Sequence, residues 1–321
     1  MKERIFWQFI FDRLSHGERV VLLIVVDYEK GSPGKTGFKM AVTPSEMAGT
    51  IGGGLMEFKL LSSTREFLAS GKPVRIVKKM VHNPNTTIGE PSGLICAGSE
   101  TICIISLSST DVAAIENIVN SIHSYIPSHF ELSTNGISFH NGKLEKHNQF
   151  QSTDIDDWHY RENVGGEYTV YIAGGGHVGL ATARMLQMLD FNLVLFDDRE
   201  DAPAIKDDSL IIRKIISPYE EIGTRIEESE KSFVAIVTAA LQSDRLALQS
   251  ILGKKLGYIG LMGTEAKIAR IMNSFSSEEK KTLEKIYAPI GIEIESRSVE
   301  EIAVSIAAQM IKVKNEASSK H

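Results

Sequence analysis

The amino-terminal half of the chain contains two kinds of hydrophobic pattern. A stripe of apolar side chains at helical spacing predicts a helix over residues 4–15 that ends at Gly17, a residue type that commonly terminates helices. Residues 19–27 (RVVLLIVVD) are a β-branched and aliphatic run without polar alternation. Such a run is typical of a strand buried on both faces of a sheet. This half of the chain is therefore predicted to be a mixed α/β domain.

Further elements are predicted downstream by the same periodicities. We expect a helix closed by Gly71 and a hairpin in which Asn135-Gly136 provides the positive φ angles of a tight turn. The expected strands cover residues 39–42, 74–81 and 101–107, and the expected helices cover residues 55–69 and 111–123.

Residues 141–166 differ in character from the sequence on either side. The stretch has few aliphatic and many charged side chains, which predicts a linker or an irregular connection between domains. The expected organisation is thus an amino-terminal domain over residues 1–140, a linker over 141–166 and a second domain over 167–321.

The second domain alternates strand and helix patterns. Alternation of this kind predicts a Rossmann-like domain with a doubly wound parallel sheet. Its last helix should begin after Ser298, which has Glu301 three residues on in a capping-box pattern, and should run to about Val313. The other expected strands cover 169–173, 193–197, 210–213, 233–238 and 258–261, and the other helices 177–189, 244–252, 264–274 and 277–286.

Composition and charge exclude several classes of function. The 321 residues carry a formal charge of −6, which argues against a protein whose main partner is nucleic acid or an anionic membrane. The longest apolar run, Val20–Val26, is far shorter than the ~20 residues of a membrane-spanning helix. The amino terminus lacks the pattern of a secretory signal, and two cysteines fit a reducing compartment, so we expect a cytoplasmic protein.

Three glycines follow the first predicted strand of the second domain. Residues 170–179 read VYIAGGGHVG, with Gly174, Gly176 and Gly179 at the spacing of a dinucleotide-binding turn between a strand and a helix. In such turns the first glycine permits a tight bend, the second lets backbone N–H groups approach a diphosphate, and the third allows close packing of helix and strand. We expect a phosphate-bearing ligand here, although the glycines alone would also fit close packing without a nucleotide.

Three polar residues near this turn are candidate contacts for that ligand. Asp197 ends the next strand and is placed to accept hydrogen bonds from a ribose hydroxyl, whereas Arg199 suits a phosphate. The choice between NAD and NADP is therefore left open. His177 lies in the first turn of the helix, where it is either a hydrogen-bonding group for the ligand or an inert capping side chain.

A second glycine cluster lies in the first domain. Residues 49–57 read GTIGGGLME, and Gly52, Gly53 and Gly54 expose backbone donors at a helix start, which predicts an anion-binding nest. Glu57 opposes this interpretation, because a carboxylate in the first turn repels a phosphate unless it points elsewhere. Upstream, Lys35 and Lys39 are candidates to restore positive charge.

The two cysteines are expected to differ in role. Cys96 lies in a glycine-flanked loop and is a candidate ligand or reactive thiolate, with a small buried hydrophobe as the alternative. Cys103 lies in a β-branched strand and is expected in the core. In an extended segment the two would lie about 23 Å apart, too far for a disulfide. No histidine pair has metal-ligand spacing on a helix face, so no tightly bound structural metal is expected.

Several motifs together resemble the XdhC/CoxI family, the xanthine dehydrogenase accessory factors. The first domain is similar through GSPGKTGFKM (31–40), GTIGGGLME (49–57) and GLICAG (93–98). The second domain is similar through AGGGHVG (173–179), FDDRED (196–201), YIGLMGTEAKI (258–268) and APIGIEIESRSVEEIAVSI (288–306). The family's Thr-x-x-His pattern appears here as Thr238 to Leu241 without a histidine, and Asp244 is retained.

This resemblance implies a role in the maturation of a molybdenum enzyme. Family members are understood to bind molybdenum cofactor, to protect it during sulfuration by a cysteine desulfurase, and to deliver it to the apoenzyme of a xanthine dehydrogenase-type molybdenum hydroxylase. It further implies a homodimer and makes Cys96 a candidate ligand of the cofactor molybdenum, since a soft metal suits a thiolate.

Two alternatives use the Rossmann pattern differently. One is an NAD(P)-dependent oxidoreductase, but no tyrosine has a lysine four residues later, so the short-chain dehydrogenase acid–base pair is missing. The other is a nucleotide-binding adaptor without catalysis. The sequence favours a maturation factor over an enzyme.

Overall fold

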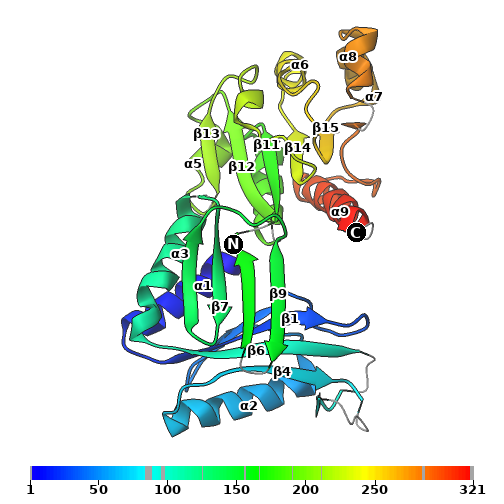
Figure 1. Ribbon diagram of the computed structural model, residues 1–321. Helices are drawn as coiled ribbons and strands as arrows, with labels where there is room; N and C mark the ends of the chain where they lie inside the picture. The colour runs from blue at the N-terminus through cyan, green and yellow to red at the C-terminus, as the bar shows by residue number, and fades with distance from the viewer. Residues whose placement is uncertain are drawn as a thin grey trace. The chain divides into compact units, whose positions relative to one another are not determined.

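The computed structural model divides the chain into two compact units (Figure 1). We call Glu3–Gly165 the amino-terminal unit and Gly166–His321 the carboxy-terminal unit. The structure describes residues 2–83, 89–94, 98–124, 126–154, 157–165, 167–189, 191–210, 212–283 and 286–318.

A six-stranded sheet is the centre of the amino-terminal unit. Its strand order is β3-β2-β1-β6-β4-β5, and β1 pairs antiparallel with both β2 and β6. The first seven residues of β1 are buried, as the unbroken apolar run predicts. The strands are β1 (Val20–Tyr28), β2 (Lys39–Val42), β3 (Met47–Gly49), β4 (Arg75–Val81), β5 (Glu90–Pro91) and β6 (Ser99–Leu107).

Helices and a second sheet cover the two faces of this sheet. On one face, Val21, Leu23 and Val25 pack against helix α2 (Gly54–Ser70), which Gly71 ends in the left-handed conformation, as expected. On the other face, the alternate residues of β1 pack against α1 (Lys2–Ser15), α3 (Val112–Ser124) and the second sheet. The 3-10 helix η1 (Ser109–Asp111) precedes α3.

The structure corrects the prediction of a linker over residues 141–166. Residues 141–166 include β9 (Asn148–Asp154) and β10 (Asp157–Asn163), which join β7 (Ser128–Ser133) and β8 (Gly136–Asn141) in an antiparallel sheet of order β8-β7-β10-β9. Trp158 and Tyr160 of β10 are buried in the core, whereas the residue between them is exposed. The low aliphatic content hid this strand because its core-facing side chains are aromatic.

The turn between β7 and β8 also differs in detail from the expectation. Ser133 pairs with Gly136, so Thr134 and Asn135 form the two-residue loop. Gly136 has a φ of 122°, whereas Asn135 has no positive φ. The hairpin is therefore correct, but only the glycine provides a positive φ angle.

The carboxy-terminal unit is the expected doubly wound α/β domain. All its strand pairs are parallel, in the order β13-β12-β11-β14-β15-β16. β11 and β14 are neighbours, and the chain order reverses between them, which is where such sheets bind ligands. The strands are β11 (Tyr168–Ala173), β12 (Phe191–Asp197), β13 (Arg213–Ile216), β14 (Ser232–Ile236), β15 (Tyr258–Leu261) and β16 (Ile286–Tyr287).

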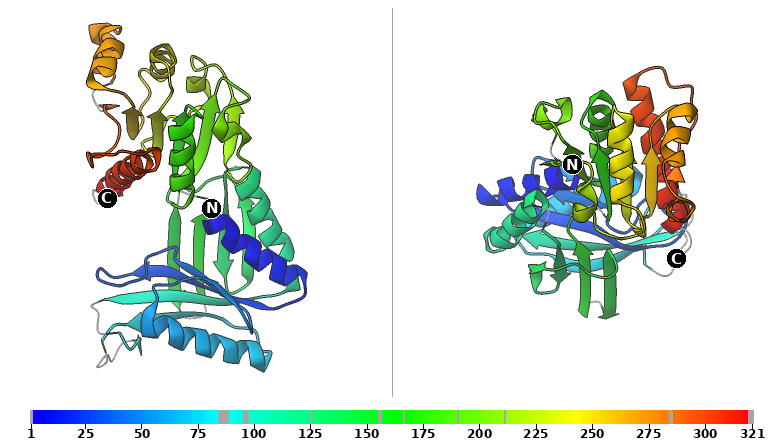
Figure 2. Two further views of the ribbon diagram at one scale, coloured as in Figure 1. Left: turned by 180° about the vertical axis from the view of Figure 1, so that it is seen from behind. Right: turned by 90° about the horizontal axis from the view of Figure 1, so that it is seen from above.

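Helices lie on both faces of this sheet (Figure 2). Helices α4 (His177–Gln187) and α9 (Val299–Ser318) share one core with the strands, and α6 (Leu241–Ser250) and α7 (Glu265–Asn273) share the other. The shorter elements are α5 (Pro203–Lys206), η2 (Ile222–Arg225) and α8 (Ser277–Lys281).

The ends of α9 illustrate how local sequence sets an element. Ser298 and Glu301 form the predicted capping box, with the Glu301 N–H donating to Ser298 Oγ at 3.2 Å and the Ser298 N–H donating to Glu301 Oε2 at 3.2 Å. The helix continues to Ser318, beyond the expected end. β13 is displaced from the predicted 210–213, and the short β16 was not predicted. Among the described helices, none combines the length and apolarity needed to cross a bilayer.

Candidate functional site

In the turn after β11, the positions occupied by glycine are glycine for different physical reasons. A Cβ at Gly179 would lie 1.8 Å from the Gly174 carbonyl oxygen, and a Cβ at Gly174, where φ is 113°, would lie 2.8 Å from the Val237 oxygen. Packing within the protein therefore requires both. Gly176, the N-cap of α4, has a φ of −69°, and a Cβ there would meet nothing within 4 Å. Its side faces open space at a helix N-terminus, where a ligand phosphate would approach.

The Asp197 carboxylate is buried beneath this turn. Its oxygens accept the Gly175 N–H at 2.6 Å, the Arg199 N–H at 3.0 Å and the Arg199 guanidinium at 2.9 and 3.1 Å. Burial alone would raise the pKa of Asp197, but the hydrogen bonds from Arg199 and Gly175 outweigh it and lower the pKa. Asp197 thus holds the glycine turn.

Arg199 and His177, the two other predicted contacts, are polar side chains exposed near the turn. The Arg199 side chain is 54 % exposed although it bonds Asp197, which has no exposed surface. His177 is the first residue of α4 and is exposed. Of the Asp197–Arg199 pair, the structure therefore presents the guanidinium to solvent. The Asp198 carboxylate, 47 % exposed, lies beside it at 3.8 Å from Arg199 Nε.

A buried ion pair adjoins the same turn from the neighbouring strand. The Thr238 hydroxyl donates to Asp244 Oδ1 at 2.5 Å, and the Lys267 ammonium pairs with the other Asp244 oxygen. Burial raises the pKa of Asp244, and Lys267 and Thr238 reduce that rise. A Cβ at Gly174 would lie 2.9 Å from the Thr238 nitrogen, which places this cluster beside the glycine turn. Lys267 was not singled out by the sequence, since its partner is distant along the chain.

In the glycine loop of the amino-terminal unit, hydrogen-bond donors are already bound by a side chain of the helix that follows the loop. Gly52, Gly53 and Gly54 have φ angles of 126°, 79° and 70°. Glu57 Oε2 accepts the Thr50 hydroxyl at 2.5 Å, the Ile51 N–H at 2.9 Å and the Gly53 N–H at 3.1 Å. The nest that the glycines predict is therefore built, but two of its amides are bound to the Glu57 carboxylate.

The two candidate lysines of this unit are in different environments. Lys39 pairs with Glu162 and also donates to the Gly37 carbonyl at 2.9 Å. Glu162 also accepts the Tyr160 hydroxyl at 2.5 Å, and the Lys39 and Glu162 side chains are only 12 % and 3 % exposed. Lys39 thus neutralises a buried carboxylate. Lys35 is exposed.

A buried polar cluster in this unit was missed by sequence reasoning. Glu100 and His82 have no exposed side-chain surface, and His82 Nε2 lies 3.5 Å from Glu100 Oε1. His82 Nδ1 contacts Ser92 Oγ at 2.8 Å, and the Gly34 N–H donates to Glu100 Oε1 at 2.7 Å. The signal was available: Glu100 lies on the same strand face as Ile102 and Ile104, where an apolar residue is expected.

One of the two cysteines lies in the described part of the chain. Cys96 is among residues 95–97, outside the described part of the chain. Cys103 is fully buried in the core, as predicted, and burial raises its pKa. Within the described residues, no group of three or more His, Cys, Asp or Glu side chains is placed to hold a metal ion.

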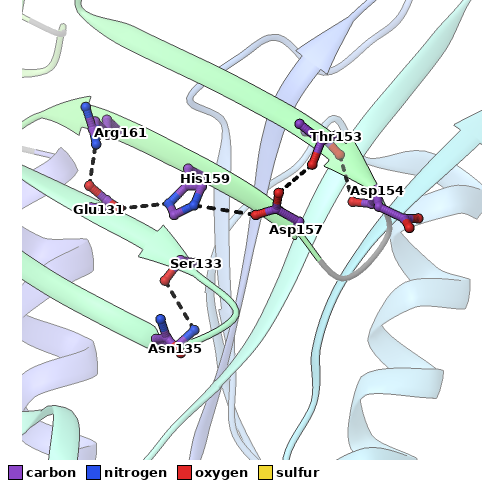
Figure 3. Close-up of polar contacts among 9 residues, drawn as sticks. Glu131, Ser133, Asn135, Thr153, Asp154, Asp157, His159 and Arg161 are labelled. Atoms are coloured by element: carbon purple, nitrogen blue, oxygen red, sulfur yellow. Dashed lines mark hydrogen bonds and ion pairs between the residues drawn. The ribbon is translucent and has the colours of Figure 1, made fainter.

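The second sheet carries a polar network on its outer face (Figure 3). His159 Nδ1 contacts Glu131 Oε1 at 2.9 Å, and Arg161 Nε donates to Glu131 Oε2 at 2.7 Å. Burial would raise the pKa of Glu131, but His159 and Arg161 lower it. The His159 and Arg161 side chains are each 47 % exposed. Exposed pairs of this kind contribute little stability, so we interpret the network as a solvated sheet face.

Comparison with protein families identifies both units. The model of the XdhC Rossmann domain matches residues 170–310, and the model of the XdhC and CoxI family matches residues 13–79. The first match spans the glycine turn and the Asp244–Lys267 pair, and the second contains the glycine loop with Glu57.

Individual relatives are distant. The uncharacterized protein YqeB of Escherichia coli is 20 % identical over 91 % of this chain, which spans 43 % of that protein. A probable xanthine dehydrogenase subunit from Bacillus subtilis is 24 % identical over 44 % of this chain and 41 % of its own length. The chain thus spans less than half of these curated relatives.

A solved structure shares the fold. The crystal structure of a xanthine dehydrogenase from Bacillus halodurans superposes with a TM-score of 0.69 at 18 % identity, covering 97 % of this chain and 96 % of that one. At this identity the likeness is one of fold.

Proposed function

Because the chain belongs to the XdhC and CoxI family, we propose that it is an accessory protein of a xanthine dehydrogenase-type molybdenum hydroxylase. In this proposal it binds molybdenum cofactor, assists sulfuration of the cofactor together with a cysteine desulfurase, and helps to insert it into the apoenzyme. The observation that carries the proposal is that both units match models of one family of accessory factors.

The chemistry of the carboxy-terminal unit fits a phosphate-bearing ligand. Molybdenum cofactor carries a phosphorylated pterin, and the open side of Gly176 at the N-terminus of α4 suits such a group. Arg199 adds an exposed guanidinium near the same turn, and His177 adds a hydrogen-bonding group. We assign the binding of a phosphate group to these three residues.

In the amino-terminal unit, the soft ligand would be Cys96. When bound, the cofactor supplies the molybdenum centre, and a thiolate is a suitable ligand for such a metal. Glu57 keeps the Gly52–Gly54 loop in one conformation through the Ile51 and Gly53 amides. In this unit the glycine loop therefore acts as a rigid support instead of a phosphate cradle.

Anaerobic titration of the purified protein with molybdenum cofactor tests the proposal. We expect saturable binding that weakens at least about tenfold in Cys96→Ala and in Gly176→Asp, which places a negative charge at the helix N-terminus. Gly176→Ala is the matched control, because it adds a Cβ at the same position, where nothing lies within 4 Å, without adding a charge. Absence of binding, or equal affinity in all variants, would refute the proposal.

Nucleotide binding is the second candidate function. Asp197 is buried with its oxygens bonded to Gly175 and Arg199, whereas Arg199 is exposed. This arrangement favours NADP, which carries a ribose phosphate, over NAD. Titration with both dinucleotides, with Arg199→Ala as the variant, tests this candidate. A preference for NAD, or an NADP affinity unaffected by Arg199→Ala, would contradict it.

A homodimer in the cytoplasm is part of the same proposal. Light scattering on the purified protein measures whether it forms a dimer. A second measurement with the client apoenzyme added measures whether the two proteins bind each other.

A further inference from the structure

His82 contacts the chain on both sides of residues 93–97. Its ring Nδ1 lies 2.8 Å from Ser92 Oγ, and its backbone N–H donates to the Gly98 carbonyl at 3.0 Å. Ser92 is itself fixed, since its N–H donates to the Val81 carbonyl at 2.9 Å and its hydroxyl accepts the Leu94 N–H at 3.1 Å. His82, directly after β4, therefore contacts the residues on both sides of this segment.

Glu100 fastens the neighbouring loop. Its Oε1 accepts the Gly34 N–H at 2.7 Å, and a Cβ at Gly34 would lie 2.6 Å from its Oε2. Gly34 in turn packs on the glycine loop, because a Cβ at Gly52 would lie 2.7 Å from the Gly34 nitrogen. The carboxylate thus holds Gly34 directly and supports the glycine loop through it.

Neither side chain is fully satisfied. Glu100 Oε2 and His82 Nε2 are buried and have no hydrogen-bond partner among the described residues. Among the described residues, a further ion pair nearby joins Glu29 and Lys79 at 3.2 Å, and it is more exposed. Across the sheet, Glu100 is opposite Tyr28 of β1 and Met80 of β4. The nearest charge partner of Glu100 is therefore His82.

Burial makes this pair sensitive to its proton count. It raises the pKa of Glu100, which the Gly34 N–H and His82 partly offset. With one shared exchangeable proton, the pair is neutral whether that proton is on the carboxyl or on the imidazole. Removing it leaves a buried anion, and adding a second leaves a buried cation, and both are costly in the interior of a protein.

We propose that Glu100 and His82 are a positioning pair whose single shared proton sets the places of Gly34 and Ser92. Where it concerns cofactor affinity, this inference rests on the proposed function. Neither residue is assigned a contact with the cofactor. The pair acts through the loops that it holds.

Side-chain and amide NMR of the intact protein tests the pair without any cofactor. We expect the Gly34 amide to change with pH at a midpoint above the ordinary range of a glutamate carboxyl, because burial raises the pKa of Glu100. The signal of the His82 ring, assigned by its loss in His82→Gln, should change with the same midpoint. In Glu100→Gln, which keeps the shape but not the ionisation, the Gly34 amide should lose that dependence. A Gly34 amide that is flat with pH in the wild type, or that titrates equally in Glu100→Gln, would overturn the proposal.

Two further variants provide a control and a substitute for Glu100→Gln. Glu57→Gln makes the same substitution at the carboxylate of the other loop, and it should leave the Gly34 titration unchanged. Ser92→Ala removes the hydroxyl beside His82 Nδ1 without touching Glu100, so it is the substitute if Glu100→Gln does not fold. It should shift the common midpoint measurably, and an unchanged midpoint would contradict the pair.

Cofactor affinity across the same pH range gives the functional readout. One linked proton changes affinity by up to about tenfold per pH unit, and we expect this dependence in the wild type but not in Glu100→Gln. If the wild type binds no cofactor at any pH, the proposed function is wrong, and the NMR result still tests whether Glu100 and His82 act as a positioning pair. If cofactor binds with the same pH profile in both proteins, the proposed role of the Glu100–His82 pair is wrong and the proposed function stands.

Discussion

The two glycine clusters have similar sequences but different structures. After β11, the carboxylate that holds the turn comes from the neighbouring strand, and Gly176 at the helix N-terminus remains open. Before α2, the carboxylate comes from the first turn of the same helix and binds the Ile51 and Gly53 amides. The position of the nearest acid, rather than the number of glycines, thus distinguishes a place for an external phosphate from a place already filled.

The largest expected effect is on the packing of the open turn. Gly179→Ala would bring a Cβ within 1.8 Å of a backbone oxygen, so we expect a loss of about 3 kcal/mol or more, or failure to fold. Gly176→Ala adds the same methyl group to open space and should cost less than about 1 kcal/mol. Urea unfolding of both variants measures this. Equal destabilisation would show that Gly176 is also a packing glycine.

The next effect concerns the acid beneath that turn. Asp197→Asn removes a charged acceptor from the Gly175 amide and from Arg199, and we expect a loss of about 2 kcal/mol at neutral pH. Because the folded-state pKa of Asp197 is lowered, this stabilisation is present above the unfolded pKa of about 3.9. It is lost as pH falls through the folded pKa.

Urea unfolding between pH 3 and 7 checks this dependence. The difference between wild type and Asp197→Asn should narrow below about pH 4, since protonation makes the wild-type side chain neutral as well. A difference that stays constant down to pH 3 would mean that the carboxylate charge does not contribute.

A smaller effect tests the filled nest. Glu57→Ala releases the Thr50, Ile51 and Gly53 donors, and we expect a cost of about 1 kcal/mol in free energy of unfolding. Inorganic phosphate should then raise the Tm of the variant by about 2 °C relative to wild type through binding to the vacated amides. Should phosphate act equally on both proteins, the two glycine clusters would not differ as described.

The sequence predicted most of the fold because the relevant signals are local. The apolar run of β1, the glycine that ends α2 and the capping box of α9 each act within a few residues. The family and the α/β class were likewise confirmed, since their motifs are continuous stretches. β10 was missed because its aromatic side chains are buried only through its pairing with β7, and β9, which pairs with β10, has no fully buried residue.

The candidate sites depended more strongly on distant contacts. The pairing of Lys39 with Glu162 joins residues 123 positions apart, and neither neighbourhood in the sequence indicates the other. The same is true of Glu100, which bonds Gly34 across 66 positions.

By itself, the sequence determined the class of fold, the family and the places of both glycine clusters, because periodicity and turn chemistry are set by neighbouring residues. Only the tertiary structure decided which donors remain for a ligand, since hydrogen bonds in the interior go to whichever acceptor the fold brings near. The turn of Gly176 remains open, and the loop of Gly53 is bound to Glu57.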